Sequence, residues 1–155
     1  MKKGFTLAEL LVVIAIIIIV LLVIYSNFYK RKGYSELDST TKQIVALLRE
    51  AQSNAMAQNK DLEWGVYFEN TSTSFYALFN TTSYSTTTSV KRYFLPSSVR
   101  YSPSIIPLGG NLMVYFNKGT GLPSTSTSIV LELYVSGQVL SSSTIRVNSS
   151  GLISY

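Results

Sequence analysis

Three patterns of apolar and polar residues follow one another along the chain, and the first is an apolar run near the N-terminus. Every residue from Leu10 to Tyr25 is apolar, and the run reaches back to Phe5 with only Thr6 and Glu9 interrupting it. An α-helix rises about 1.5 Å per residue, so about 20 apolar residues cross the hydrocarbon core of a bilayer. The stretch Phe5–Tyr25 therefore predicts a membrane-spanning helix.

The second pattern has helical spacing and covers residues 26–60. Five apolar residues fall three, four or seven positions apart and form one stripe on a helix, namely Leu37, Ile44, Leu48, Ala51 and Ala55. Such a stripe is the ordinary face by which a helix packs on a sheet. Val45 and Leu47 broaden the stripe. The two patterns together predict one long helix, transmembrane in residues 5–32 and amphipathic in residues 33–60.

Glycine and proline set the expected continuity of this helix. Residues 5–32 contain neither, so we predict an unbroken helix through the apolar run, with Gly33 as its weakest point. The polar segment Asn59-Lys60-Asp61 is expected to form the turn that ends the helix.

The third pattern alternates between apolar and polar residues in short runs, which is typical of strands. Glycine, proline, asparagine, serine and threonine separate these runs. Residues 61–155 therefore predict a small antiparallel β-sheet or sandwich, and the fold class is α+β. The expected strands are Glu63–Glu69, Ser74–Phe79, Val90–Leu95, Asn111–Asn117, Ile129–Val135, Thr144–Asn148 and Leu152–Tyr155.

Composition narrows the possible chemistry. The 155-residue chain has no histidine and no cysteine, so the usual catalytic triads and thiolate metal centres are unavailable. A serine–lysine pair remains conceivable, but no serine lies in a recognisable catalytic motif. We therefore expect no enzyme, no cofactor and no metal site. The net charge of +5 is a weak basic balance and does not by itself indicate nucleic-acid binding.

Glu9 is the unusual residue of the apolar run. A carboxylate costs about 2.5–3.5 kcal/mol at the middle of a membrane helix and less near its end. One explanation is that Glu9 reaches the nearby headgroups. Lys2 and Lys3 before an apolar run also begin a secretory signal peptide, but no small-residue cleavage site follows Tyr25. An uncleaved signal anchor is a further alternative, although it gives no role to Gly4 or Glu9.

The first residues resemble the class III signal of type IV prepilins and pseudopilins. The resemblance lies in Lys2-Lys3-Gly4 followed by FTLAELLVVIAI. It implies cleavage between Gly4 and Phe5 by a prepilin peptidase, N-methylation of Phe5, and assembly with other pilins through an inner-membrane platform. Glu9 then occupies the acidic position of the family. The new ammonium of one subunit would pair with Glu9 of its neighbour and offset the cost of burying that carboxylate.

This resemblance also sets the expected topology. Residues 1–4 would be the leader, and the mature chain would cross the inner membrane once before entering a filament. Lys2-Lys3 and Lys30-Arg31-Lys32 flank the apolar run almost equally, so charge alone does not decide its orientation. We favour a cytoplasmic N-terminus, because four residues are less plausibly translocated than a domain that suits the exterior.

The remainder resembles minor pseudopilins of the GspH/FimT type in pieces. These are the helix-to-strand passage after Leu47, the segment Met113–Pro123 and the closing segment Thr144–Tyr155, whereas Asn70–Ser104 matches nothing that we recognise. The resemblance implies a structural subunit of a type IV pilus or of a type II secretion pseudopilus. The calcium loop of major pseudopilins is poorly supported, because Glu132 is the sole acidic residue after Glu69.

DNA binding by a competence pseudopilin is the alternative function. Lys91, Arg92 and Arg100 alternate with aromatic residues, and this combination suits phosphate contacts with base stacking. The simpler interpretation is a solvated strand with its aromatic residues in the core. We favour the simpler interpretation.

Overall fold

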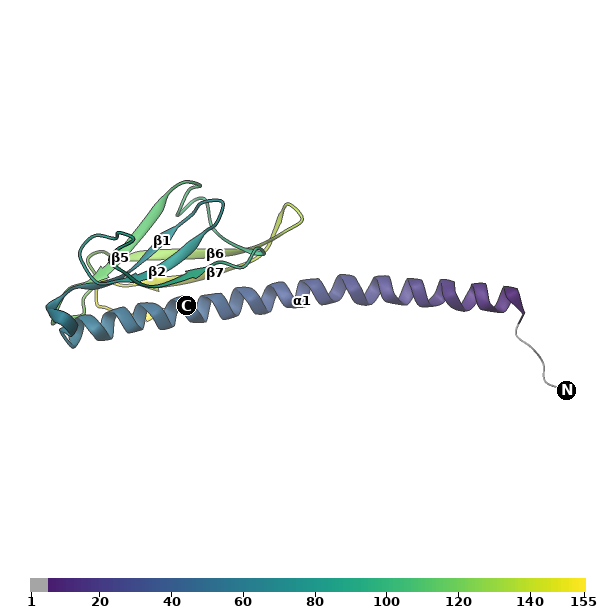
Figure 1. Cartoon of the computed structure of the whole chain (residues 1–155), viewed down its shortest axis with the longest axis horizontal. Helices are drawn as coiled ribbons and strands as arrows, with labels where there is room; N and C mark the ends of the chain where they lie inside the picture. Colours follow the sequence, from purple (N-terminus) through teal and green to yellow (C-terminus); the bar gives the residue numbers. More distant parts are fainter. Residues whose placement is uncertain (1–5) are drawn as a thin grey trace.

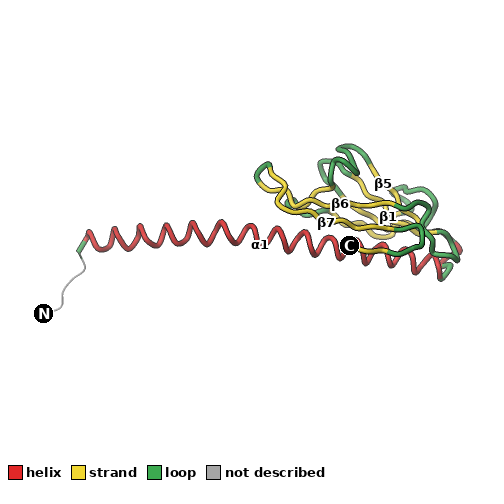
Figure 2. Tube along the Cα trace, turned by 180° about the vertical axis from the view of Figure 1, so that it is seen from behind, coloured by secondary structure: helices red, strands yellow, loops and turns green. Residues whose placement is uncertain are grey.

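The protein consists of one long helix with a β domain packed along its C-terminal half (Figure 1). The structure is a computed structural model that describes the backbone of residues 6–155 and the side chains of residues 6–21 and 31–155. Helix α1 spans Leu7–Met56, 50 residues, as one uninterrupted element. Its N-terminal part extends away from the β domain, as the view from behind also shows (Figure 2). No helix among the described residues combines the length and hydropathy needed to cross a membrane.

Among the described residues, eight strands form two four-stranded sheets, and every strand pairing is antiparallel. The first sheet has the order β3-β2-β1-β5 and the second has the order β4-β6-β7-β8. This architecture confirms the α+β class with antiparallel sheets. The strands are β1 (Trp64–Glu69), β2 (Phe75–Phe79), β3 (Ser89–Phe94), β4 (Val99–Tyr101), β5 (Asn111–Phe116), β6 (Thr127–Val135), β7 (Gln138–Val147) and β8 (Ile153–Ser154).

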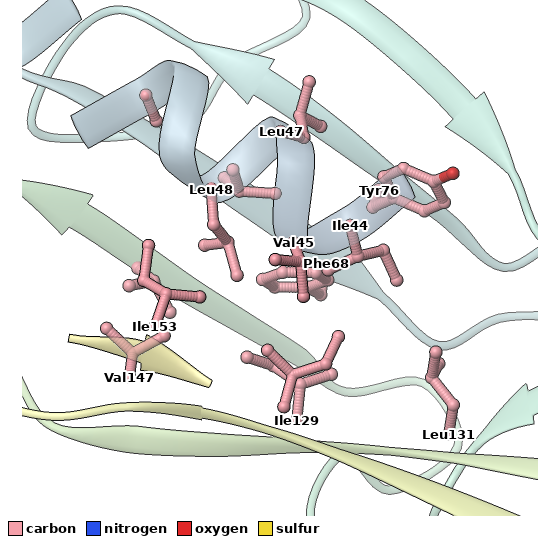
Figure 3. Packing of buried hydrophobic residues seen from close by; sticks show 14 of the residues in the cluster. Ile44, Val45, Leu47, Leu48, Phe68, Tyr76, Ile129, Leu131, Val147 and Ile153 are labelled. Atoms are coloured by element: carbon pink, nitrogen blue, oxygen red, sulfur yellow. The ribbon is translucent and has the colours of Figure 1, made fainter. Parts of the chain in front are cut away.

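The core lies between the C-terminal half of α1 and the two sheets. All five residues of the predicted stripe are buried, as are Val45 and Leu47 beside them. In Figure 3, Ile44 and Leu48 of α1 point towards Phe68 of the first sheet and Ile129 of the second. Because the helix contacts strands of both sheets, it is an integral part of the hydrophobic core.

The helix end and the role of Gly33 differ from the predictions. The helix ends at Met56, because Gln58 has a φ of 51°, and a 3-10 turn follows at Asn59–Asp61. The helix passes through Gly33 without interruption, and Gly33 is buried. A Cβ atom at Gly33 would lie 2.8 Å from Cδ1 of Leu133 in β6. Gly33 is therefore a point of close approach between helix and sheet, a role that the sequence did not predict.

Two strand predictions were also incomplete. Strand β4 was not predicted, and it lies at the edge of the second sheet. Strand β7 was predicted only from Thr144, whereas it begins at Gln138. The additional residues pair with β6, including Leu133 with Ser141. These residues are mostly polar, so their own sequence does not indicate a strand. They form one because β6 pairs with them.

Candidate functional site

The N-terminal end of α1 carries the residues that the sequence singled out. Thr6 is the N-cap, with an extended backbone, and its hydroxyl accepts a hydrogen bond from the backbone N–H of Glu9 at 3.2 Å. In return, Oε2 of Glu9 accepts hydrogen bonds from the backbone N–H and the hydroxyl of Thr6, both at 3.0 Å. This reciprocal arrangement is a capping box, which satisfies backbone donors that the first helical turn leaves without partners.

The capping box gives Glu9 a structural role within one molecule. Its carboxylate lies in the first turn, where the partial positive charge of the helix end stabilises an anion. Headgroup contact and an ammonium on a neighbour were the partners predicted for Glu9, and neither of them is Thr6. The four-residue pattern Thr6-Leu7-Ala8-Glu9 matches the capping-box signature and contained the missing signal. Gly4 and Phe5, the predicted cleavage and methylation positions, lie outside the described residues.

Apolar side chains surround α1 beyond the β domain. Between Leu7 and Leu21, every leucine, isoleucine and valine side chain is at least 44% exposed. A helix that is apolar around its whole circumference is characteristic of a membrane or of the interior of a larger assembly. Apart from Glu9, residues Leu7–Leu21 contain no charged residue. This part of the helix therefore presents an apolar surface that the described protein does not cover.

The structure places two of the candidate DNA contacts together on β3. The ammonium of Lys91 lies 2.6 Å from Oε1 of Glu50 in α1, and this contact raises the pKa of Lys91. The guanidinium of Arg92 donates to the Tyr84 hydroxyl at 2.7 Å and lies 4.5 Å from the ring centre of Phe75. Both cations thus have partners within the protein.

Arg100 lies on β4, in the other sheet, and is not grouped with Lys91 and Arg92. Its guanidinium contacts Oε2 of Glu132 through Nε at 3.0 Å and Nη2 at 2.9 Å. The same guanidinium lies 3.6 Å from the ring centre of Tyr134. The three cations therefore do not form one continuous basic surface.

A comparison with protein families matches the same end of the chain. The model described as the prokaryotic N-terminal methylation motif matches residues 1–25. The chain therefore carries a type IV prepilin-like class III signal, and the motif supports a type IV pilin or pseudopilin. No curated protein and no solved structure matches the chain.

This motif has consequences for processing and location. It implies cleavage by a prepilin peptidase, attachment to a membrane and then association with other pilins in a pilus. Proteins with such a signal are generally structural subunits and not enzymes. The match ends at Tyr25, so it says nothing about the β domain.

Proposed function

We propose that the chain is a minor pilin or pseudopilin of the GspH/FimT type that assembles as a structural subunit. Cleavage between Gly4 and Phe5 and N-methylation of Phe5 would precede its entry into a type IV pilus or a type II secretion pseudopilus. The observation that carries this proposal is the uncovered apolar part of α1, which has the capping box of Thr6 and Glu9 at its N-terminal end and a folded β domain at its other end.

The size of the apolar surface supports two successive environments. Twelve leucine, isoleucine and valine side chains between Leu7 and Leu21 are exposed. Burial of one such side chain stabilises by about 1.5–3 kcal/mol, so the twelve together favour an apolar environment by an amount on the order of 20 kcal/mol. Lipid supplies that environment before assembly, and the helices of neighbouring subunits supply it afterwards. In the sequence the apolar run continues to Tyr25, which gives the length for one crossing of the inner membrane.

The Glu9 carboxylate would be more stable in a filament than in the membrane, and this difference would favour assembly. Its hydrogen bonds to Thr6 offset only part of the cost of placing a carboxylate in lipid. Cleavage creates a new amino group on Phe5, and the ammonium of an adjacent subunit would be the missing countercharge for Glu9. Assembly therefore pairs two charges that are each unfavourable in lipid.

The β domain supports the choice of a minor subunit. The segments that resemble the GspH/FimT type form the C-terminal part of α1 leading to β1, strand β5 with the turn at Gly119, and the closing strands β7 and β8. In the proposed topology this domain lies outside the inner membrane and the N-terminus is cytoplasmic. The domain would form the surface of the filament, whereas α1 would line its core.

The test compares Glu9→Ala with Asp38→Ala in cells that assemble the filament. Asp38 is the matched control because it is an exposed acid on the same helix, paired with Lys42 at 2.7 Å. We expect both variants to insert into the membrane. Glu9→Ala should enter filaments at least about tenfold less than Asp38→Ala, because it lacks the carboxylate that pairs with the neighbouring ammonium. A tenfold loss corresponds to about 1.4 kcal/mol. Equal incorporation of the two variants would contradict the charge-pairing mechanism and leave Glu9 with its capping role alone.

The alternative is a competence pseudopilin that binds DNA during uptake through Lys91, Arg92 and Arg100. Each of these cations would have to exchange a partner within the protein for a phosphate, which makes this function the weaker candidate. Unchanged DNA affinity and transformation in a Lys91→Ala/Arg92→Ala variant would eliminate it. A marked loss of both, with filament assembly intact, would favour it.

A further inference from the structure

The hairpin formed by β6 and β7 extends beyond the core of the β domain. Its last pairs are Tyr134 with Val139 and Val135 with Gln138, and the two-residue turn is Ser136-Gly137. Both turn residues have positive φ, 52° and 82°, as in the tight turns that suit the twist of a hairpin. Figures 1 and 2 show that this hairpin projects on the side of the domain nearest the N-terminal part of α1.

The end of the hairpin is unusually apolar for an exposed turn. Tyr134 is 37% exposed, Val139 is 48% exposed and Leu140 is 37% exposed. In contrast, the preceding β6 residue Leu133 is fully buried beside Gly33. Tyr134, Val139 and Leu140 are therefore partly exposed at the end of the hairpin, whereas Val135 beside them packs against the core.

Tyr134 is also held in position. The Arg100 guanidinium covers one face of its ring at 3.6 Å, and the two contacts to Glu132 fix that guanidinium. A tyrosine with an apolar ring and a polar hydroxyl suits the boundary between lipid and water, where tyrosine and tryptophan are enriched. The ring is therefore oriented before any partner arrives.

The charges around this end of the domain favour an anionic partner. The helix carries Lys30-Arg31-Lys32 immediately before Gly33, and residues 133–155 include no aspartate or glutamate. The nearby acids each face a cation, because Glu36 lies 3.6 Å from Lys32 and Glu132 contacts Arg100. Basic residues beside a membrane helix are attracted to anionic lipids.

The position along the helix places this surface near the headgroups. Leu133 lies at the level of Gly33, and Gly33 follows the end of the apolar run at Tyr25 by eight residues, or about 12 Å of helix. The headgroup layer accounts for about 5–8 Å of that distance. The end of the hairpin lies on the side of the domain that faces the N-terminal part of α1 (Figures 1 and 2). An ordinary helix tilt of about 20° narrows the remaining gap.

We propose that the end of this hairpin, Tyr134, Val139 and Leu140, contacts the headgroup layer of an anionic membrane before assembly. The contact forms a second attachment point beside α1 and fixes the tilt and rotation of the helix in the bilayer. This inference rests on the proposed function, because it requires α1 to lie in the membrane.

The test uses the full-length chain in vesicles of phosphatidylglycerol and phosphatidylethanolamine. The chain contains no cysteine, so one introduced cysteine carries a single environment-sensitive fluorophore. Three variants are compared, namely Val139→Cys at the hairpin, Ser150→Cys as an exposed control in the turn before β8, and Ile17→Cys in the apolar part of α1. We expect lipids spin-labelled at the headgroup to quench the Val139 label at least threefold more strongly than the Ser150 label.

The Ile17 label separates failure of this inference from failure of the proposed function. Quenching of the Ile17 label by spin-labelled acyl chains, with equal weak quenching at Val139 and Ser150, would overturn the hairpin contact alone. An Ile17 label that acyl-chain quenchers do not reach would overturn the membrane state and the hairpin contact with it. A change in the emission of the Val139 label that appears only at high protein-to-lipid ratios, without headgroup quenching, would assign the hairpin to a second copy of the chain and contradict lipid contact.

Discussion

The contact between Gly33 and Leu133 allows a direct test of how α1 is fixed to the β domain. An alanine Cβ at position 33 would lie 2.8 Å from Cδ1 of Leu133, 3.5 Å from Cδ2 and 3.7 Å from Cγ. Leu133 is fully buried, so it has little room to move away. The perturbation is a double-mutant cycle of Gly33→Ala and Leu133→Ala, in which the contact exists in one background and is absent in the other.

Two opposing effects determine the expected magnitudes. Replacing glycine by alanine inside a helix stabilises by about 1 kcal/mol, whereas overpacking a core costs about 1–3 kcal/mol. Gly33→Ala alone should therefore lower the free energy of unfolding by about 0–2 kcal/mol. Leu133→Ala should lower it by about 2–5 kcal/mol through the cavity that it leaves. In the Leu133→Ala background the clash is gone, and Gly33→Ala should raise stability by about 1 kcal/mol.

Urea unfolding of the full-length chain in mild detergent provides the measurement. Trp64 is the only tryptophan and is 4% exposed, so its fluorescence reports unfolding of the core. Ser53→Ala, exposed on the same helix, serves as the control and should change stability equally in both backgrounds. If Gly33→Ala stabilises the chain by about 1 kcal/mol in both backgrounds, Gly33 does not pack against Leu133 and the reasoning is refuted.

Three further predictions concern the β domain and its contacts with α1. Gly65→Ala should lower the free energy of unfolding by about 3 kcal/mol in urea titrations, because its Cβ would lie 2.5 Å from the carbonyl oxygen of Val114; a loss below about 1 kcal/mol would contradict this contact. Burial raises the pKa of Tyr76 to about 12, so the unfolded chain ionises first and stability should fall between about pH 10 and 12. The fall, measured by circular dichroism, should be smaller in Tyr76→Phe, and equal slopes would argue against this cause. Lys91→Ala should leave the urea midpoint of unfolding unchanged because both partners of the pair with Glu50 are exposed to solvent, and a clear fall of the midpoint would show a stronger pair.

The parts of the fold that depend on local pattern were predictable from the sequence. The stripe from Leu37 to Ala55 has helical spacing, and each of its members is buried in the structure. Most strands were also identified, because the alternation of apolar and polar residues and turn residues such as Gly109-Gly110 can be recognised within a few positions of the sequence. The apolar run likewise identified the N-terminal part of α1, because a long run without glycine or proline favours one continuous helix.

The parts that depend on distant partners were not predictable. Strand β4 has only three residues and no visible period, and its strand conformation comes from pairing with β6. The first half of β7 contains the polar run Ser141–Ser143, which is typical of a loop until β6 supplies its partner. The burial of Gly33 has the same origin, because Leu133 is 100 positions away in the sequence.

The residues of the candidate site also fall into those with local partners, which the sequence could predict, and those with distant partners, which it could not. The capping box joins Thr6 to Glu9 within one helical turn, and its signature was present in the sequence. The partners of the basic residues are long-range, since Lys91 contacts Glu50 on α1 and Arg100 contacts Glu132 across a strand pair. The pattern of basic and aromatic residues left a nucleic-acid surface open as the less favoured alternative, and the sequence did not reveal the separate ion pairs of Lys91 and Arg100.

The mass of the mature chain, purified from a cell that contains a prepilin peptidase, is the most direct test of the central proposal. We expect a chain that begins at Phe5, lacks Met1–Gly4 and carries one added methyl group at its new N-terminus. In a peptidase-deficient cell the same chain should keep its leader. A mature protein that still begins at Met1, or one cleaved after Tyr25, would contradict the assignment of this chain to filament assembly.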